Sequence, residues 1–286
     1  MPGGLKPLTM KPGFLAPIPF FTAMIVATAL AYPWWQAIIL NSLLLLLAWL
    51  LPKKLLTPAG YLHAWLLGVV IWGCMGWRGY SVVMVYFLLG SAVTRLGMAR
   101  KQAAGIAEGR SGRRGPENVW GSALTAAVCA LALAALQLGG TAPLREVWQP
   151  LLSLAYVSSL STKLSDTTAS EVGKAYGRRT FLITTLKPVP PGTEGAVSLE
   201  GTLAGIGGSA LMAATGWGIG LIPPWGVGVC LIAALLATTG ESLIGATLQT
   251  RFPWLTNEVV NIINTTLGAI LALMLGYSWK FLQASA

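Results

Sequence analysis

The sequence predicts an all-α fold, a polytopic transmembrane bundle of about eight or nine helices. Of its 286 residues, 55% are hydrophobic and only 10% are charged, and the mean hydropathy is +0.68. Such values are typical of helical membrane proteins rather than soluble domains. A helix that crosses a bilayer needs roughly 17–25 apolar residues. Candidate runs occupy about 14–32, 34–51, 60–76, 78–98, 118–139, 147–173, 199–219, 225–247 and 259–280.

The count is eight or nine because the first of these runs either spans the membrane or does not. It contains Pro17 and Pro19 and ends at Pro33. Proline interrupts helical hydrogen bonding, so this segment is either a further membrane helix or an interfacial or re-entrant one. We expect residues 1–33 to be an N-terminal extension and residues 34–286 to form a single transmembrane domain.

The basic residues predict how the bundle is oriented. The net charge is +10, but the Lys and Arg residues lie mostly in short loops between apolar runs, which indicates membrane topology rather than nucleic-acid binding. If the Lys53-Lys54 loop is cytoplasmic, alternation places the loops at 99–117, 174–198 and 248–258 on the same side. Those three loops hold ten Lys or Arg, whereas the opposite side keeps only Arg78, Arg145 and Lys280. We therefore expect a basic cytoplasmic face.

Several kinds of site are excluded or disfavoured. A single histidine, His63, rules out a metal site with several histidines. The three cysteines lie in apolar runs and never as CxxC, which favours packing. No GxxxxGK[ST] motif occurs, so there is no Walker-type phosphate loop. The row Gly201, Gly205 and Ser209 predicts close helix packing rather than nucleotide binding.

The long polar stretch at 158–202 carries the candidate chemistry. It contains Asp166, the only aspartate in the chain. A carboxylate near a bilayer is costly unless it is paired or faces a wet cavity. Because Mg²⁺ prefers one or two carboxylates plus phosphate oxygens, we expect Asp166 to bind Mg²⁺, with Glu171 or Glu241 as a second ligand and Ser170 hydrogen-bonding nearby. The alternative is a Lys163–Asp166 ion pair that only holds helices together.

The segment that follows has the features of an anion-binding turn. Glycine lets backbone amides approach an anion, and a helix that begins near Ser198 points its positive end there. Two more helices are expected to begin on the same face, near 116–118 and 256–257. The candidate nucleotide- or phosphate-binding residues are Arg113, Arg114, Ser170, Lys174, Lys187, Gly192, Thr193, Gly195 and Ser198.

A third group of polar residues is expected to line the same cavity from other helices. On the penultimate helix Glu241 and Ser242 share a face, and on the last helix three asparagines recur at helical spacing. Interhelical hydrogen bonding is the alternative for such amides. The candidate cavity-lining residues are Glu117, Asn118, Glu241, Ser242, Asn257, Asn261 and Asn264.

Five blocks, taken in order, resemble the phytyl-phosphate kinase family of tocopherol biosynthesis in its cyanobacterial form. They are GIAEGRSGRRG, SDTTASEVG, TTLKPVPPGTEGAVSLEGT, GESLIGATLQ and TNEVVNIINTTLGA. The resemblance covers roughly residues 34–280 and is more distant to dolichol kinases and other CTP-using membrane transferases. It implies a membrane kinase that moves a phosphoryl group from CTP, or another nucleoside triphosphate, to phytyl or another prenyl monophosphate. Asp166, Ser170 and Glu171 match one block, and Lys187, Gly192, Thr193, Gly195 and Ser198 match another.

The resemblance gives the 34–286 domain a catalytic role, with Asp166, Glu171 and Lys187 as its catalytic residues and Mg²⁺ as its cofactor. The expected partners are a prenyl-phosphate lipid, a nucleoside triphosphate and membrane lipid, in a plasma or thylakoid membrane. One alternative is a cytidylyltransferase that makes a CDP-lipid on the same architecture. A small-solute transporter is a further alternative, disfavoured because the polar groups cluster on one side.

Overall fold

The computed structural model describes residues 34–285 except Lys53 and Thr250. Within these residues the fold has eight α-helices, which confirms the all-α prediction. The predicted run at 14–32 and the extension at 1–33 lie outside the described residues. The long helices are α2 (Trp34–Leu50), α3 (Pro58–Arg95), α5 (Pro116–Gly139), α6 (Ala142–Tyr176), α7 (Leu199–Gly218), α8 (Pro224–Ile244) and α9 (Asn257–Ser285).

Short elements connect these helices. A six-residue helix, α4 (Met98–Ala103), and a 3₁₀ turn, η1 (Gly109–Gly112), join α3 to α5. Two antiparallel strands of two residues each, β1 (Phe181–Leu182) and β2 (Ala196–Val197), lie between α6 and α7. A π-helical turn, η2 (Gly245–Gln249), extends α8. The small β1–β2 pair is the only strand structure within the described residues, and the sequence did not predict it.

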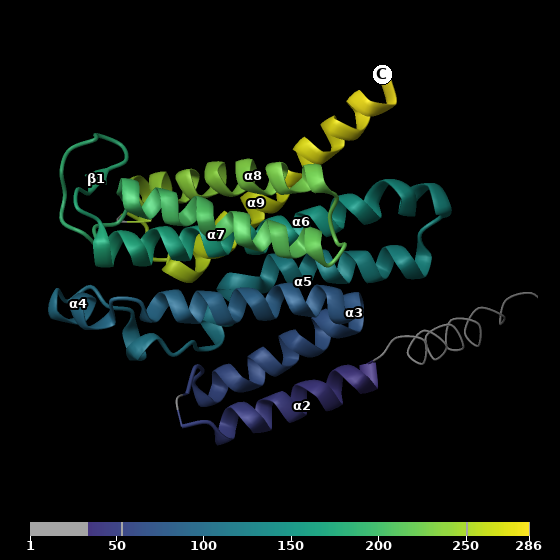
Figure 1. Cartoon of the computed structure of the whole chain (residues 1–286), viewed down its shortest axis with the longest axis horizontal. Helices are drawn as coiled ribbons and strands as arrows, with labels where there is room; N and C mark the ends of the chain where they lie inside the picture. The colour runs from purple at the N-terminus through teal and green to yellow at the C-terminus, as the bar shows by residue number, and fades with distance from the viewer. Residues whose placement is uncertain (1–33, 53, 250, 286) are drawn as a thin grey trace, which may run out of the picture.

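Helix α3 contains two predicted runs, 60–76 and 78–98, joined by a reversal at Gly76. The backbone there has φ 62° and ψ −159°, a region that glycine reaches at little cost. Figure 1 shows the two halves of α3 running in opposite directions beside α2. The predicted boundary between the two runs is therefore confirmed, since α3 consists of two helices that meet at Gly76.

Helix α6 is the centre of the bundle. It contacts α3, α5, α7, α8 and α9, and nearly every side chain between Leu151 and Asp166 is buried. Four other helical segments are long and apolar enough to span a membrane: Pro58–Arg95, Pro116–Gly139, Pro224–Gln249 and Asn257–Gln283. Since α6 is surrounded by protein rather than lipid, it can carry hydroxyl and charged groups.

The connecting loops sort to the two ends of the bundle as the alternation of helices predicts. The segment after α2, the α4–η1 segment, the β1–β2 loop and the segment between η2 and α9 gather at one end, on the left of Figure 1. The turn within α3, the α5–α6 connection and the α7–α8 connection lie at the other end. The basic loops therefore meet at one end of the molecule.

Glycines bring α7 close to α6, as the small-residue row predicts. A Cβ on Gly201 would lie 2.6 Å from the backbone oxygen of Ala169, and one on Gly205 would lie 3.0 Å from that of Ser165. Real Cβ atoms do not approach backbone so closely, so any larger side chain must separate the helices. This contact fixes α6, and with it Asp166, against the start of α7.

Replacing Gly201 with Ala is expected to lower the stability of the protein by about 1–3 kcal/mol, because the added methyl group overpacks the α6–α7 contact. Gly207 is the matched control, since it lies on the same helix and a Cβ there meets nothing within 4 Å. Gly207→Ala should be neutral or slightly stabilising, because alanine is the better helix former. Thermal unfolding in detergent compares the two, and equal transitions for both variants would contradict the close contact.

Candidate functional site

A polar cavity of about 390 Å³ opens at the end of the bundle where the basic loops meet. Its volume is within the range of small-molecule sites, about 300–1,000 Å³. Walls come from α5, α6, α8 and α9, and the β1–β2 loop covers one side. Fifteen of the predicted site residues line it: Arg113, Arg114, Asn118, Asp166, Ser170, Glu171, Lys174, Gly192, Thr193, Gly195, Ser198, Glu241, Ser242, Asn257 and Asn261.

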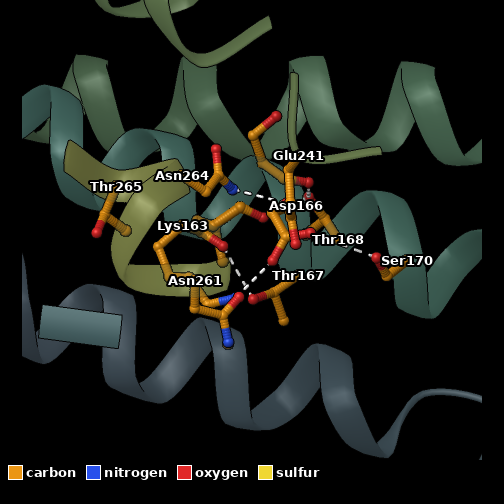
Figure 2. Close-up of polar contacts among 12 residues, drawn as sticks. Lys163, Asp166, Thr167, Thr168, Ser170, Glu241, Asn261, Asn264 and Thr265 are labelled. Carbon is orange, nitrogen blue, oxygen red and sulfur yellow. Dashed lines mark hydrogen bonds and ion pairs between the residues drawn. The ribbon is translucent and has the colours of Figure 1, made fainter. Parts of the chain in front are cut away.

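Two carboxyl groups from different helices meet in this cavity. Asp166 of α6 and Glu241 of α8 lie against each other (Figure 2). Lys163, one turn earlier on α6, forms an ion pair with Asp166 Oδ2. The pairing that the sequence offered as an alternative role for Asp166 is therefore present. Its other oxygen, Oδ1, receives a long hydrogen bond of 3.4 Å from Ser170 Oγ, as predicted for Ser170.

The asparagines of α9 hold this group in position (Figure 2). Lys163 Nζ donates to Asn261 Oδ1 at 2.6 Å, and Asn264 Nδ2 donates to Glu241 Oε2 at 2.7 Å. Asn261 also lines the cavity, whereas Asn264, predicted as cavity-lining, is buried behind Glu241. Both interpretations therefore apply to Asn261, which bonds across helices and borders the site, whereas Asn264 only bonds across helices.

The charge balance at this centre leaves room for a cation or a shared proton between the two carboxyl groups. Two ionised carboxylates and one ammonium leave a net charge of −1, and adjacent carboxylates cannot both ionise without a further positive charge or a shared proton. Two carboxylates with room for phosphate and water oxygens is the donor set that Mg²⁺ takes. Within the described part of the chain no cluster of three or more His, Cys, Asp or Glu side chains has the arrangement of a metal site. The residues fit a Mg²⁺ that is completed by substrate oxygens.

Glu171 is held in a separate ion pair. Buried Lys101, from α4, bonds its Oε2, and Lys174 Nζ lies 3.8 Å from its Oε1. Lys101 also donates to the backbone oxygen of Thr94 at 2.8 Å. Glu171 was predicted as a catalytic group and a second metal ligand, but here its carboxylate joins α4 to α6, while Glu241 is the carboxylate beside Asp166.

Three cations besides Lys163 border the cavity. Lys174 and Arg113 lie at its wall, and Arg113 is exposed. Arg114 is fixed more firmly, because its Nη1 donates to the hydroxyl of Tyr86 at 2.9 Å. Its guanidinium also stacks over the Tyr86 ring, 5.3 Å from the centroid. A preorganised arginine fork of this kind suits a phosphate oxygen.

The three helices predicted to begin near the site do begin at this end of the bundle, as does α3. The predicted three are α5 at Pro116, α7 at Leu199 and α9 at Asn257. Ser198 caps α7, accepting a hydrogen bond from the amide of Gly201 at 3.1 Å. The helix termini and their backbone amides favour an anion in the cavity.

The predicted anion-binding turn lies over the cavity. Gly192 and Gly195 both have positive φ, 88° and 75°, which glycine adopts readily. A Cβ on Gly195 would lie 2.6 Å from the backbone oxygen of Ser242, so the turn packs directly on the end of α8. This contact brings the polar loop and Glu241 to one place.

Two predicted site residues lie away from the cavity. Lys187 is exposed on the β1–β2 loop, where its backbone oxygen accepts from the amide of Leu182 at 2.9 Å. Glu117 lies in the first turn of α5 and pairs with Arg110, outside the cavity lining. The ion pair with Arg110 holds the Glu117 side chain, and the backbone bond to Leu182 holds the loop segment that carries Lys187.

Two lysines that the prediction left out of the site pair with its carboxylates. Lys163 was considered only as a partner of Asp166, yet it borders the cavity and bonds across to α9. Lys101 was counted only as a loop charge. The signal for Lys163 is its i, i+3 spacing from Asp166, whereas Lys101 meets Glu171 across 70 positions and leaves no local signal.

In comparison with known proteins, all residues of this site lie within a region that matches one family. The model of the family described as "Integral membrane protein DUF92" matches residues 41–269. The chain is 65% identical over 245 residues to the uncharacterized membrane protein sll0875 of Synechocystis, which covers 86% of this chain and 92% of that protein. It is 46% identical over 248 residues to "Protein VTE6, chloroplastic" of Arabidopsis thaliana, covering 86% and 73%.

A more distant relative is the uncharacterized membrane protein MJ0933 of Methanocaldococcus jannaschii, 29% identical over 224 residues, covering 78% of this chain and 87% of that protein. No solved structure matches the chain. These matches confirm the family resemblance drawn from the sequence blocks, including its cyanobacterial form.

Proposed function

The chain belongs to the DUF92 family of integral membrane proteins, and we propose that it is a membrane kinase acting on a prenyl monophosphate. Phytyl phosphate is the expected acceptor, CTP or another nucleoside triphosphate the donor, and the product a prenyl diphosphate for tocopherol synthesis. One observation carries the proposal. Facing carboxylates, Asp166 and Glu241, stand in a cation-bordered cavity at the end of an apolar bundle.

The proposed reaction needs alignment and charge neutralisation more than covalent chemistry. An oxygen of the prenyl phosphate attacks the γ-phosphorus of the nucleotide and forms a new P–O bond. The bond from the γ-phosphorus to the β,γ-bridging oxygen breaks, and the nucleoside diphosphate leaves with the electron pair. A phosphate acceptor at neutral pH is already largely deprotonated, so no base has to take a proton. This agrees with a chain that has a single histidine.

The residues of the cavity divide into two roles in this scheme. Asp166 and Glu241 would hold Mg²⁺, which would supply neutralisation of phosphate charge when bound. Lys163 keeps Asp166 oriented. Arg113, Arg114 and Lys174 border the same space and would neutralise the phosphates of donor and acceptor. The glycine turn at 192–195 and the start of α7 would add backbone amides.

The arrangement of the bundle suits a lipid acceptor. The apolar helices would keep the prenyl tail in the membrane while its phosphate enters the cavity at the basic end. We propose that this end faces the cytoplasm, because positively charged loops remain on that side, and that the membrane is the plasma or thylakoid membrane.

The experiment that tests the proposal is an assay of the purified protein in nanodiscs with Mg²⁺, phytyl phosphate and each of the four ribonucleoside triphosphates. The expected result is a nucleoside diphosphate and phytyl diphosphate, identified by mass, with CTP the preferred donor. A cytidylyltransferase on the same architecture would instead release pyrophosphate and a CDP-lipid, and that result would overturn the kinase. Turnover of no nucleotide, with uptake of solute into liposomes, would favour a transporter.

A further inference from the structure

A second, apolar cavity adjoins the site cavity. It measures about 140 Å³ and lies between α2, α3 and α5. Tyr86, Arg114 and Ser122 line both cavities, so the two adjoin at these residues. Beyond them the wall of this cavity, here called the α2–α3–α5 groove, is mainly hydrocarbon, including Leu45, Ala48, Leu67, Met84 and Phe87.

The polar side chains of the groove are already paired with one another or with backbone. Tyr80 donates to Asn41 Oδ1 at 2.9 Å, and Asn41 Nδ2 donates to the oxygen of Ala37 at 2.8 Å. The Tyr61 hydroxyl and the Trp65 indole donate to the oxygen of Ala48 and to Ser42 Oγ, at 3.2 and 3.1 Å. A polar ligand would have to break these bonds, whereas a hydrocarbon leaves them intact. The chemistry of the groove therefore selects a hydrocarbon.

The junction between the two cavities selects an anion. Arg114 lies there, held by its hydrogen bond to Tyr86 and by ring contacts to Tyr86 and Phe87. Gly90 leaves the space for it, since a Cβ at that position would lie 2.6 Å from Arg114 Nη2. A positive charge at the mouth of an apolar groove matches a molecule whose hydrocarbon begins directly at an anionic group.

The size of the groove limits how much hydrocarbon it can enclose. An apolar cavity of about 150 Å³ in another protein admits one benzene molecule, so about 140 Å³ accommodates roughly one isoprene unit. Helix α2 packs on α3 at the edge of the bundle, and its outer residues Leu43, Leu46 and Leu47 are exposed. The rest of a long tail would leave the groove along α2 into lipid.

We propose that the α2–α3–α5 groove binds the isoprene unit next to the phosphate of a prenyl monophosphate, with Arg114 contacting that phosphate. The inference rests on the proposed function for the identity of the lipid. It also specifies where the acceptor enters the cavity. The prenyl phosphate comes from the groove, on the side opposite the β1–β2 loop and Gly192–Gly195. The nucleotide then occupies the part of the cavity beneath that loop.

Photolabelling tests the groove without requiring turnover. The probe is a prenyl monophosphate with a diazirine in its first isoprene unit, irradiated with the protein in nanodiscs and mapped by mass spectrometry. Labels on the groove residues of α2, α3 or α5, such as Ala48, Met84 or Phe87, and their loss with excess phytyl phosphate, would support the proposal. Labels confined to α7 or α8 would overturn the groove and leave the kinase standing. If excess phytyl phosphate displaces none of the labelling, the prenyl phosphate is not the acceptor, and the proposed function itself is overturned.

A pair of variants tests the same groove by kinetics. Ala64 lines the groove, and Ala92 lies exposed on the same helix outside both cavities. Ala64→Phe should raise KM for phytyl phosphate about tenfold or more, as expected when a pocket loses room for methylene groups, with KM for CTP unchanged. Ala92→Phe should change neither. If Ala64→Phe does not fold, Ala48→Leu on α2 takes its place. Equal KM values for a folded groove variant and Ala92→Phe would refute the proposal.

Discussion

Replacing Asp166 with Asn is expected to lower turnover by about 10²–10³-fold, the effect of losing one preorganised electrostatic group from a transition state. Asparagine keeps the shape of the side chain but not its charge, so Lys163 and Glu241 would remain and the cation would lose one ligand. The loss should be accompanied by a shift of half-maximal activation to higher Mg²⁺ concentration, because a cation with one ligand fewer binds more weakly. Steady-state assays with CTP and phytyl phosphate over a Mg²⁺ series measure both effects.

The control for this variant is Glu146→Gln, because Glu146 is exposed near the start of α6, far along the helix from Asp166. It removes one carboxylate with no effect expected on the cavity. Thermal unfolding should show that both variants are folded. An Asp166→Asn protein that folds and turns over at the wild-type rate would refute the assignment of Asp166 as a metal ligand.

Lys101→Met is expected to destabilise the protein by about 3–5 kcal/mol, because removing one partner of a buried ion pair leaves the other charge uncompensated. Lys101 is fully buried and Glu171 is 5% exposed. The remaining partner of Glu171, Lys174, is 3.8 Å away. The double variant Lys101→Met/Glu171→Gln should recover a large part of the loss, since it removes the orphaned charge. Unfolding transitions in detergent measure this series.

Lys187→Met is the matched control for that series, because Lys187 is exposed and lies outside the cavity. We expect no loss of stability and little change in turnover. If Glu171 acts mainly by pairing with Lys101, the folded double variant should retain most of its activity. A folded double variant with no activity would instead return Glu171 to the metal-binding role that the sequence suggested.

The helices could be predicted from the sequence because each depends on local composition. Apolar runs of membrane length located α2, both halves of α3, and α5 to α9, and Gly76 stands where the pattern divides α3. The charges of the loops alone predicted which connections between helices lie together at one end of the bundle. The β1–β2 pair is four residues in a polar loop, too short to leave a pattern of alternating hydrophobicity.

The site could be predicted in part, for a different reason. Asp166, Ser170 and the glycine turn are close in sequence and carry an unusual polarity for a membrane protein, and they do meet in one cavity. The choice between Glu171 and Glu241 depends on contacts between distant segments. Lys101 reaches Glu171 from α4, and α8 brings Glu241 to Asp166. Such pairings arise from tertiary packing, which the spacing of residues on one helix does not determine.

The proposed transfer is tested most directly by following the γ-phosphoryl group itself. The protein in nanodiscs receives Mg²⁺, phytyl phosphate and CTP labelled with ¹⁸O on the non-bridging γ-oxygens, and the lipid product is examined by mass spectrometry with fragmentation. The account predicts phytyl diphosphate with the label in its terminal phosphate, and unlabelled CDP. A CDP-phytyl product with labelled pyrophosphate, or a phytyl lipid that acquires no label, would contradict it.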